Sequence, residues 1–177
     1  MILPSLPPSD WVLNHLREIP HGGRVLDLAC GHGRRARALA QAGFDVLAVD
    51  RDGEALMSLA ACPGVTTQPM ELEAADWPLA GESFDGIVVT NYLWRPRLAD
   101  VLALLAPGGV LIYETFMVGN AEFGKPSNPD FLFLPGELRA VATEAGLSVI
   151  AFQEGFRQQP KPAMVQAIVA RREIGGD

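Results

Sequence analysis

The sequence predicts an α/β fold: a doubly wound, mostly parallel seven-stranded sheet with helices on both faces and an antiparallel last strand. Seven apolar segments of strand length alternate with helix-patterned segments through most of the 177 residues, which is typical of parallel strands joined by crossover helices. Only a short turn at residues 158–162 separates the last two strands, which indicates an antiparallel pair. The length and the 49% hydrophobic content suit a single globular domain over residues 1–177.

Turn and capping residues bound each expected element. We expect strands over residues 24–29, 45–49, 65–68, 85–90, 110–116, 147–156 and 163–170. We expect helices over residues 11–19, 34–41, 52–61, 97–105 and 135–145, with Ser9 or Asp10 capping the first and Asp52 the third. The proline-rich residues 1–8 predict a flexible N-terminus. Residues 117–134 are long for a loop in a compact domain, which predicts a lid or a substrate-selecting wall.

The composition favours a small-molecule partner over nucleic acid or a membrane. The net charge is −7, whereas nucleic-acid binders usually carry a basic field. Arg34, Arg35 and Arg37 could form a local basic patch or a solvated helix face. No apolar run approaches the length of a membrane span. Because the N-terminus lacks a signal-peptide pattern, and Cys30 and Cys62 give no disulfide framework, we expect a cytoplasmic location.

Residues 24–33, Arg-Val-Leu-Asp-Leu-Ala-Cys-Gly-His-Gly, carry the strongest functional signal. A strand, a two-glycine turn (Gly31, Gly33) and a helix follow one another, and glycine lets backbone N–H groups approach a ligand closely. The acid within this strand, Asp27, would repel the pyrophosphate of a dinucleotide and attract a cation. The loop is therefore expected to bind a nucleotide-like ligand that carries positive charge.

This run resembles the first motif of class I S-adenosylmethionine-dependent methyltransferases. Residues 47–50 resemble the family's second strand with its ribose-binding acid, residues 82–89 its fourth strand, and residues 105–112 the L-x-P-G-G-x-L turn into its fifth. The resemblance covers residues 20–117. The chain is similar to small stand-alone bacterial members of the family, including the tellurite-resistance type. It implies a Rossmann-like methyltransferase fold, S-adenosylmethionine as cofactor and S-adenosylhomocysteine as product.

The resemblance also implies which residues bind the cofactor. Asp27 is expected to hold the methionine ammonium, directly or through water, and Asp50 to accept the ribose hydroxyls. Arg51 covers the adenine ring or is solvated, and Glu71 is preferred over Glu73 and Asp76 for the adenine amine. The expected cofactor-binding set is Asp27, Ala29, Cys30, Gly31, Gly33, Asp50, Arg51, Glu71, Leu72 and Asn91, and no metal is expected.

On the acceptor side, Tyr92 and Glu114 are the candidate catalytic residues. The family places groups facing the transferred methyl at residues 90–93, where this chain lacks the prolines typical of exocyclic-amine methylases. Tyr92 or Trp94 could wall the acceptor pocket or pack in the core. Glu114 could act as a general base, bind a cationic acceptor, or pair with an arginine. A thiol, an amine or a metalloid oxyanion would suit in-line transfer without a strong base.

Two other functions stay open. Residues 31–36 fit a loose G-x-G-x-x-A pattern, which allows an NAD(P)-dependent oxidoreductase. Asp27 and the proline–glycine–glycine turn before the fifth strand argue against it. A non-catalytic S-adenosylmethionine-binding module is the third possibility, although the aromatic residues of the loop at 117–134 favour a substrate pocket.

Overall fold

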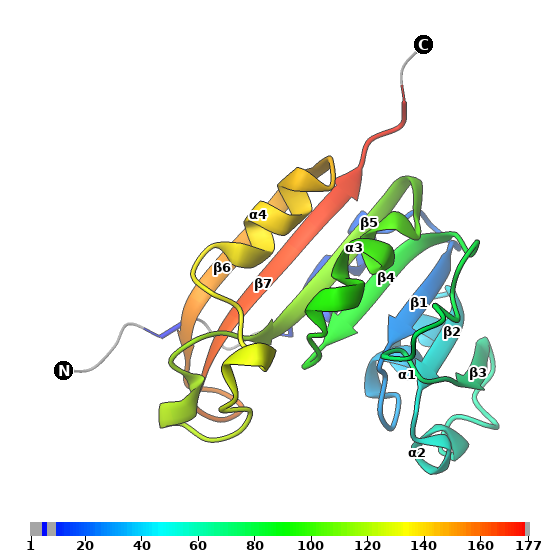
Figure 1. Cartoon of the computed structure of the whole chain (residues 1–177). Helices are drawn as coiled ribbons and strands as arrows, with labels where there is room; N and C mark the ends of the chain where they lie inside the picture. Colours follow the sequence, from blue (N-terminus) through cyan, green and yellow to red (C-terminus); the bar gives the residue numbers. More distant parts are fainter. Residues whose placement is uncertain (1–4, 7–9, 176–177) are drawn as a thin grey trace.

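A single seven-stranded sheet forms the centre of the molecule (Figure 1), in the order β3-β2-β1-β4-β5-β7-β6. The computed structural model describes residues 5–6 and 10–175. Strand β7 runs antiparallel to both β5 and β6, and the other neighbouring pairs are parallel. The strands are β1 Arg24–Leu28, β2 Asp45–Asp50, β3 Val65–Pro69, β4 Phe84–Thr90, β5 Leu105–Phe116, β6 Leu147–Arg157 and β7 Ala163–Arg172. The predicted fold class is confirmed.

Helices cover both faces of this sheet. One apolar cluster packs α3 and α4 against the sheet through residues such as Leu98 and Leu138, and a second packs η1 and α1 through the partly buried Leu16 and through Leu39. Figure 1 shows α3 and α4 on the same side of the sheet. The helices are η1 Leu13–Glu18, α1 Arg34–Gln41, α2 Gly53–Met57, α3 Arg95–Ala103, η2 Asn120–Glu122, η3 Pro129–Phe131 and α4 Glu137–Glu144.

Three helices are shorter than the sequence predicts, among them α4, which spans Glu137–Glu144 where the sequence predicts residues 135–145. The first is a 3₁₀ helix over Leu13–Glu18 whose N-cap residue is Val12, not the expected Asp10, although the Leu13 N–H donates to Asp10 Oδ1 at 3.2 Å. The third predicted helix stops at Met57 instead of residue 61. Beyond Met57 the chain continues in tighter turns, in which the Leu59 N–H donates to Leu56 O and the Ala60 N–H to Met57 O.

The expected flexible segment, residues 1–8, lies outside the described residues apart from Ser5 and Leu6, and Leu6 N–H donates to Phe156 O at 2.7 Å. Among the described residues, no helix is long and apolar enough to cross a membrane.

Two residues with a left-handed backbone mark the carboxyl edge of the sheet. Ala29 follows β1 with φ +54°, and Asn91 follows β4 with φ +56°. Non-glycine residues avoid this region at a cost of about 1–3 kcal/mol, and such strain gathers at functional sites. In doubly wound folds this edge is also where ligands bind.

Candidate active site

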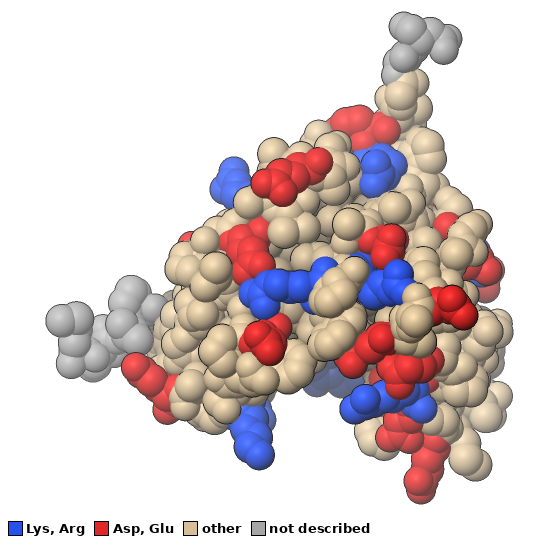
Figure 2. Space-filling view, in the orientation of Figure 1, with Lys and Arg blue, Asp and Glu red and all other residues tan. Residues whose placement is uncertain are grey.

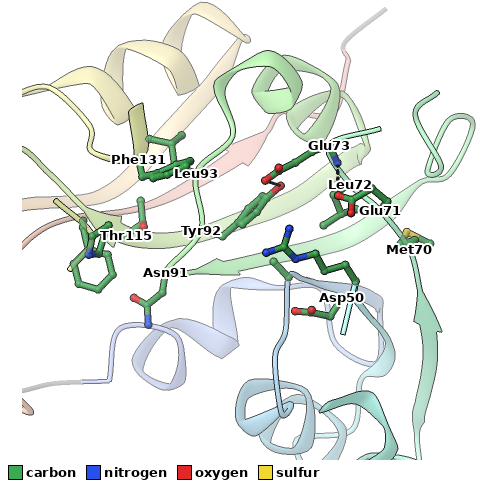
Figure 3. Close-up of a pocket in the computed structure, with 14 residues that line it drawn as sticks. Asp50, Met70, Glu71, Leu72, Glu73, Asn91, Tyr92, Leu93, Thr115 and Phe131 are labelled. Atoms are coloured by element: carbon green, nitrogen blue, oxygen red, sulfur yellow. Dashed lines mark hydrogen bonds between the residues drawn. The ribbon is translucent and has the colours of Figure 1, made fainter. Parts of the chain in front are cut away.

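A cavity of about 470 Å³ opens at this edge, where β1, β2, β4 and β5 end (Figure 3). Its volume lies within the roughly 300–1,000 Å³ range of small-molecule pockets. Figure 3 shows Asp50, Glu71 and Glu73 on one side, Leu93, Thr115 and Phe131 on the other, and Tyr92 between them. The lining residues are Ala29, Asp50, Arg51, Met70, Glu71, Leu72, Glu73, Asn91, Tyr92, Leu93, Thr115, Phe116, Pro126 and Phe131.

The glycine loop is fixed beside the cavity by backbone geometry. Gly33, with φ +82°, precedes α1, and a Cβ there would lie 2.3 Å from Leu59 Cδ1. Gly31 has φ +56° and open space where its Cβ would be, and its N–H donates to Asp50 Oδ2 at 2.9 Å. The other Asp50 oxygen accepts from the Asp52 N–H at 2.9 Å. Asp50 therefore joins the glycine loop to the end of β2.

Three carboxylates surround the adenosine side expected from the sequence. Glu71 and Glu73 are exposed, and Glu71 Oε1 accepts from the Glu73 N–H at 3.2 Å. The Tyr92 hydroxyl lies 3.4 Å from Glu73 Oε1. Burial, followed by the charge of Glu73, raises the pKa of Tyr92, so this phenol stays neutral near pH 7 and its O–H donates a hydrogen bond to Glu73.

Cys30, Gly31 and Gly33 do not line the cavity but form the loop beside it. Burial raises the pKa of the Cys30 thiol to about 12, which keeps it protonated near pH 7 and unsuited to nucleophilic attack.

Asp27 lies beneath this loop rather than in the cavity wall. Its side chain points to the α1 side of the sheet, because its strand neighbours Leu26 and Leu28 pack on the opposite side. It is 1% exposed, and neither carboxylate oxygen accepts a hydrogen bond of good geometry from the described residues. Burial raises its pKa to about 7, although Arg35 opposes the rise. This burial leaves Asp27 no direct contact with the cavity.

Glu114 is also separated from the cavity. On β5, Tyr113 packs in the α3 and α4 cluster and Thr115 lines the cavity, so the intervening Glu114 faces the α1 side. Glu114 Oε1 accepts from Arg157 Nη1 at 2.9 Å, and both side chains are nearly buried. Burial raises the pKa of Glu114, and Arg157 opposes the rise. This is the arginine pairing that the sequence left open, and the geometry does not support a general base acting in the cavity.

Apart from Leu93 in the 90–93 segment, the sequence did not single out the residues at the apolar end of the cavity. Leu93, Thr115 and Phe116 line it, as do two residues of the 117–134 loop, Pro126 and Phe131. The loop itself was signalled by its length and aromatic content, but nothing local identified which of its side chains turn inward. Trp94, an alternative wall residue, lines a separate small pocket with Leu98 and Tyr113.

The loop at residues 117–134 is anchored at several points. Arg95, the first residue of α3, donates to Glu137 Oε1 at 2.7 Å and Oε2 at 2.8 Å, and also to the carbonyls of Asp130 at 2.9 Å and Leu132 at 2.6 Å. Nearer the start of the loop, buried Asn120 donates to Pro126 O at 3.0 Å and accepts from Met164 N–H at 3.1 Å. These contacts hold the loop against the sheet beside the cavity.

Acidic and basic side chains are interspersed on one face of the molecule (Figure 2). On the face that Figure 2 shows, acidic side chains surround a few basic ones, and the described residues form no broad basic field there. Of the three arginines that could have made a patch, Arg35 lies 3.7 Å from Asp10, and Arg37 binds the carbonyls of His32 and Ser58.

Comparison with known proteins identifies the domain. A family model described as a methyltransferase domain matches residues 25–109. The putative methyltransferase YqeM of Bacillus subtilis is 29% identical over 125 residues, which cover 64% of this chain and 50% of that protein. The ubiquinone biosynthesis O-methyltransferase of Cereibacter sphaeroides is 35% identical over 104 residues, 53% of this chain and 41% of that protein. The chain thus spans about half the length of the curated relatives it matches.

Solved structures show the same fold. TehB from Haemophilus influenzae superposes with a TM-score of 0.75 at 20% identity, covering 91% of this chain and 61% of TehB. The matched domain includes the glycine loop, the acid that ends β2 and the proline–glycine–glycine segment, which lies within β5. Residues 25–109 therefore form a methyltransferase domain, and the chain has the fold of S-adenosylmethionine-dependent methyltransferases.

Proposed function

We propose that this chain transfers a methyl group from S-adenosylmethionine to a small-molecule acceptor. The observation that carries the proposal is one cavity with two unlike ends, acidic at β2 and apolar at β5 (Figure 3). An acidic end suits a ligand with ammonium and sulfonium charges, and an adjacent apolar end offers space for a second molecule.

The residues present fit the cofactor. Nothing occupies the position of a Cβ at Gly31, so a ligand can closely approach the backbone of the loop there. Asp50 keeps lone pairs free for the ribose hydroxyls after its two backbone bonds, and Leu72 with Met70 offers an apolar surface for the adenine ring. Asp27 lies beneath the glycine loop, so it acts on the cofactor through its charge rather than by direct contact.

The bound cofactor supplies an activated methyl group. The chain's own contribution is orientation and exclusion of water. Tyr92 is a neutral phenol whose one O–H donates to Glu73, so its oxygen can accept a hydrogen bond that orients the acceptor. No histidine lines the cavity among the described residues, so an acceptor that is already a good nucleophile fits best.

Further support comes from the relatives and the surface. One matched relative is named as an O-methyltransferase of ubiquinone biosynthesis, which is consistent with a small acceptor. The net charge of −7 disfavours a nucleic-acid acceptor. We further propose that residues 1–177 act as one catalytic domain in which residues 117–134 form the acceptor wall. A cytoplasmic location stays a prediction.

Calorimetric titration with S-adenosylmethionine, S-adenosylhomocysteine and NADH tests the cofactor directly. We expect both adenosyl ligands to bind and NADH to give no heat. Asp50→Asn should weaken the adenosyl ligands at least about tenfold, or about 1.4 kcal/mol. Asp45→Asn is the matched control, because Asp45 is an exposed acid at the opposite end of the same strand. Binding of NADH alone would instead favour the oxidoreductase, and adenosyl binding without turnover on any acceptor would favour the non-catalytic module.

A further inference from the structure

We propose that the acceptor is a neutral molecule with a flat apolar ring, and that the site disfavours anionic acceptors. The inference rests on the proposed function and narrows its substrate class. Four kinds of observation carry it: the walls of the apolar end, the charges around the cavity, the neutral polar groups near the acceptor, and the way in which the wall is held.

Apolar and aromatic side chains enclose the acceptor end. Leu93, Phe116, Pro126 and Phe131 line it from three different segments, the turn after β4, the end of β5 and the 117–134 loop. Phe131 is 39% exposed although it belongs to the cavity wall, which leaves a large aromatic surface uncovered at the site. A ring packed on such surfaces removes apolar area from water, at about 25 cal/mol per Å².

The charged side chains of the cavity favour cations and neutral molecules. Asp50, Glu71 and Glu73 line it as carboxylates, whereas Arg51 is the one guanidinium among its described lining residues. Arg51 directly follows Asp50, at the end expected to hold the cofactor. An oxyanion or carboxylate acceptor would therefore meet an acidic field without a cationic partner of its own.

Nearby arginines do not supply that partner. Arg95 is engaged by Glu137 and by carbonyls of the 117–134 loop, and Arg157 is paired with Glu114 on the other side of the sheet. Arg35 lies 3.7 Å from Asp10 and near Asp27, beneath the glycine loop. The apolar end therefore lacks the free guanidinium groups that bidentate recognition of an oxyanion uses.

Neutral polar groups lie where the acceptor's nucleophilic atom would be oriented. Thr115 and Asn91 line the cavity, as does Tyr92, whose phenol is kept neutral by burial. These groups bind a hydroxyl or amino substituent by hydrogen bonds and carry no charge. A lone pair of that substituent forms the new bond to the methyl carbon, while the C–S bond breaks and its electron pair stays on sulfur, which becomes a thioether. The acceptor's proton passes to water.

The wall is held before the acceptor arrives. Arg95 fixes the chain around Phe131 through the carbonyls on either side of it, and Asn120 fixes Pro126. A pre-held wall lowers the ordering cost of binding, so a small ring can bind without closing a loop.

Calorimetry on protein saturated with S-adenosylhomocysteine tests the inference with two matched rings. The probes are 4-hydroxybenzyl alcohol, which is neutral, and 4-hydroxybenzoate, which differs by its carboxylate; selenite represents a metalloid oxyanion. We expect the neutral ring to bind at least about tenfold tighter than the anion, or about 1.4 kcal/mol, and selenite to give no heat. Equal or tighter binding of the benzoate or selenite, or silence from both rings, would overturn the inference.

Failure of the proposed function gives a different result. If S-adenosylhomocysteine itself does not bind, then the proposed function fails, and the acceptor inference falls with it. If S-adenosylhomocysteine binds but the anionic probes bind as tightly as the neutral ring or more tightly, the proposed function stands and only the acceptor class is overturned.

Substitutions locate the ring. Phe131→Ala should weaken the neutral ring at least about fivefold with unchanged affinity for S-adenosylhomocysteine, because it removes apolar wall area. Phe123→Ala is the control, since Phe123 lies in the same loop but packs on Phe156, with ring centroids 5.1 Å apart, outside the cavity. Glu73→Gln should lower the ratio of the affinity for the neutral ring to the affinity for the benzoate. Equal losses in both phenylalanine variants, or an unchanged preference in Glu73→Gln, would contradict the proposed geometry.

Discussion

Arg95 should stabilise the acceptor wall more than any other single side chain of the 117–134 loop region. Its guanidinium donates two bonds to the Glu137 carboxylate and bonds to the carbonyls of Asp130 and Leu132, all between 2.6 and 2.9 Å. The Arg95 side chain is 35% exposed and that of Glu137 is 21% exposed, so solvent screens part of this gain. After that discount, Arg95→Met should cost about 2–3 kcal/mol.

A loss of that size lowers Tm by roughly 4–12 °C in a domain of this length. It should be local in origin, so chymotrypsin should cut after Phe123 and Phe131 faster than in the parent protein. The matched control is Arg24→Met, which removes the ion pair with Glu82 at 2.8 Å, far along the chain from the loop. If the loop of Arg95→Met is cut no faster than that of the Arg24 variant, then the wall is held by something other than this arginine.

Three further results are expected. Burial raises the pKa of Asp27 from 3.8 to about 7, so ionisation of Asp27 destabilises the fold as pH rises through that window. Asp27→Asn should therefore stabilise the ligand-free protein at pH 8, by about 4 kcal/mol at most in urea titrations, and this gain should be lost by pH 4. Glu114→Gln should lower the free energy of unfolding by about 1–3 kcal/mol, while kcat stays within about threefold. A hundredfold fall in kcat without destabilisation would instead indicate that Glu114 acts as a general base. Gly33→Ala should cost about 2–4 kcal/mol in chemical unfolding, because its Cβ would collide with Leu59, but Gly31→Ala only about 1 kcal/mol; equal costs would refute the packing argument.

The strands and the glycine loop could be predicted from the sequence because their signals are local. Turn residues bounded each apolar run, and the glycines sat where the backbone needs positive φ, at Gly31 and Gly33. Asp50, Glu71 and Asn91 were found for the same reason, since each follows the carboxyl end of a strand and these ends share one edge of the sheet.

The face of each buried acid could not be predicted in this way. Central parallel strands are covered by helices on both sides, so β1 and β5 are apolar on both faces and carry no alternation that marks one side. The sequence therefore placed Asp27 and Glu114 at the correct edge but could not tell that both face α1. Phe131 and Pro126 were missed for another reason, because their positions depend on contacts with Arg95 and Asn120 that are distant in sequence or peculiar to the folded loop.

The burial of Asp27 connects fold stability with cofactor choice. A carboxylate without a hydrogen-bond partner of good geometry is costly to ionise, which is what its raised pKa expresses. A cation bound above the glycine loop lowers that cost, because the loop rather than bulk water separates the cation from the Asp27 carboxylate, and their attraction is then screened less. An anionic or neutral nucleotide offers no such compensation. The same acid that weakens the ligand-free fold therefore favours a sulfonium cofactor over a dinucleotide, and the cofactor's gain in affinity should grow as Asp27 ionises between pH 6 and about 8.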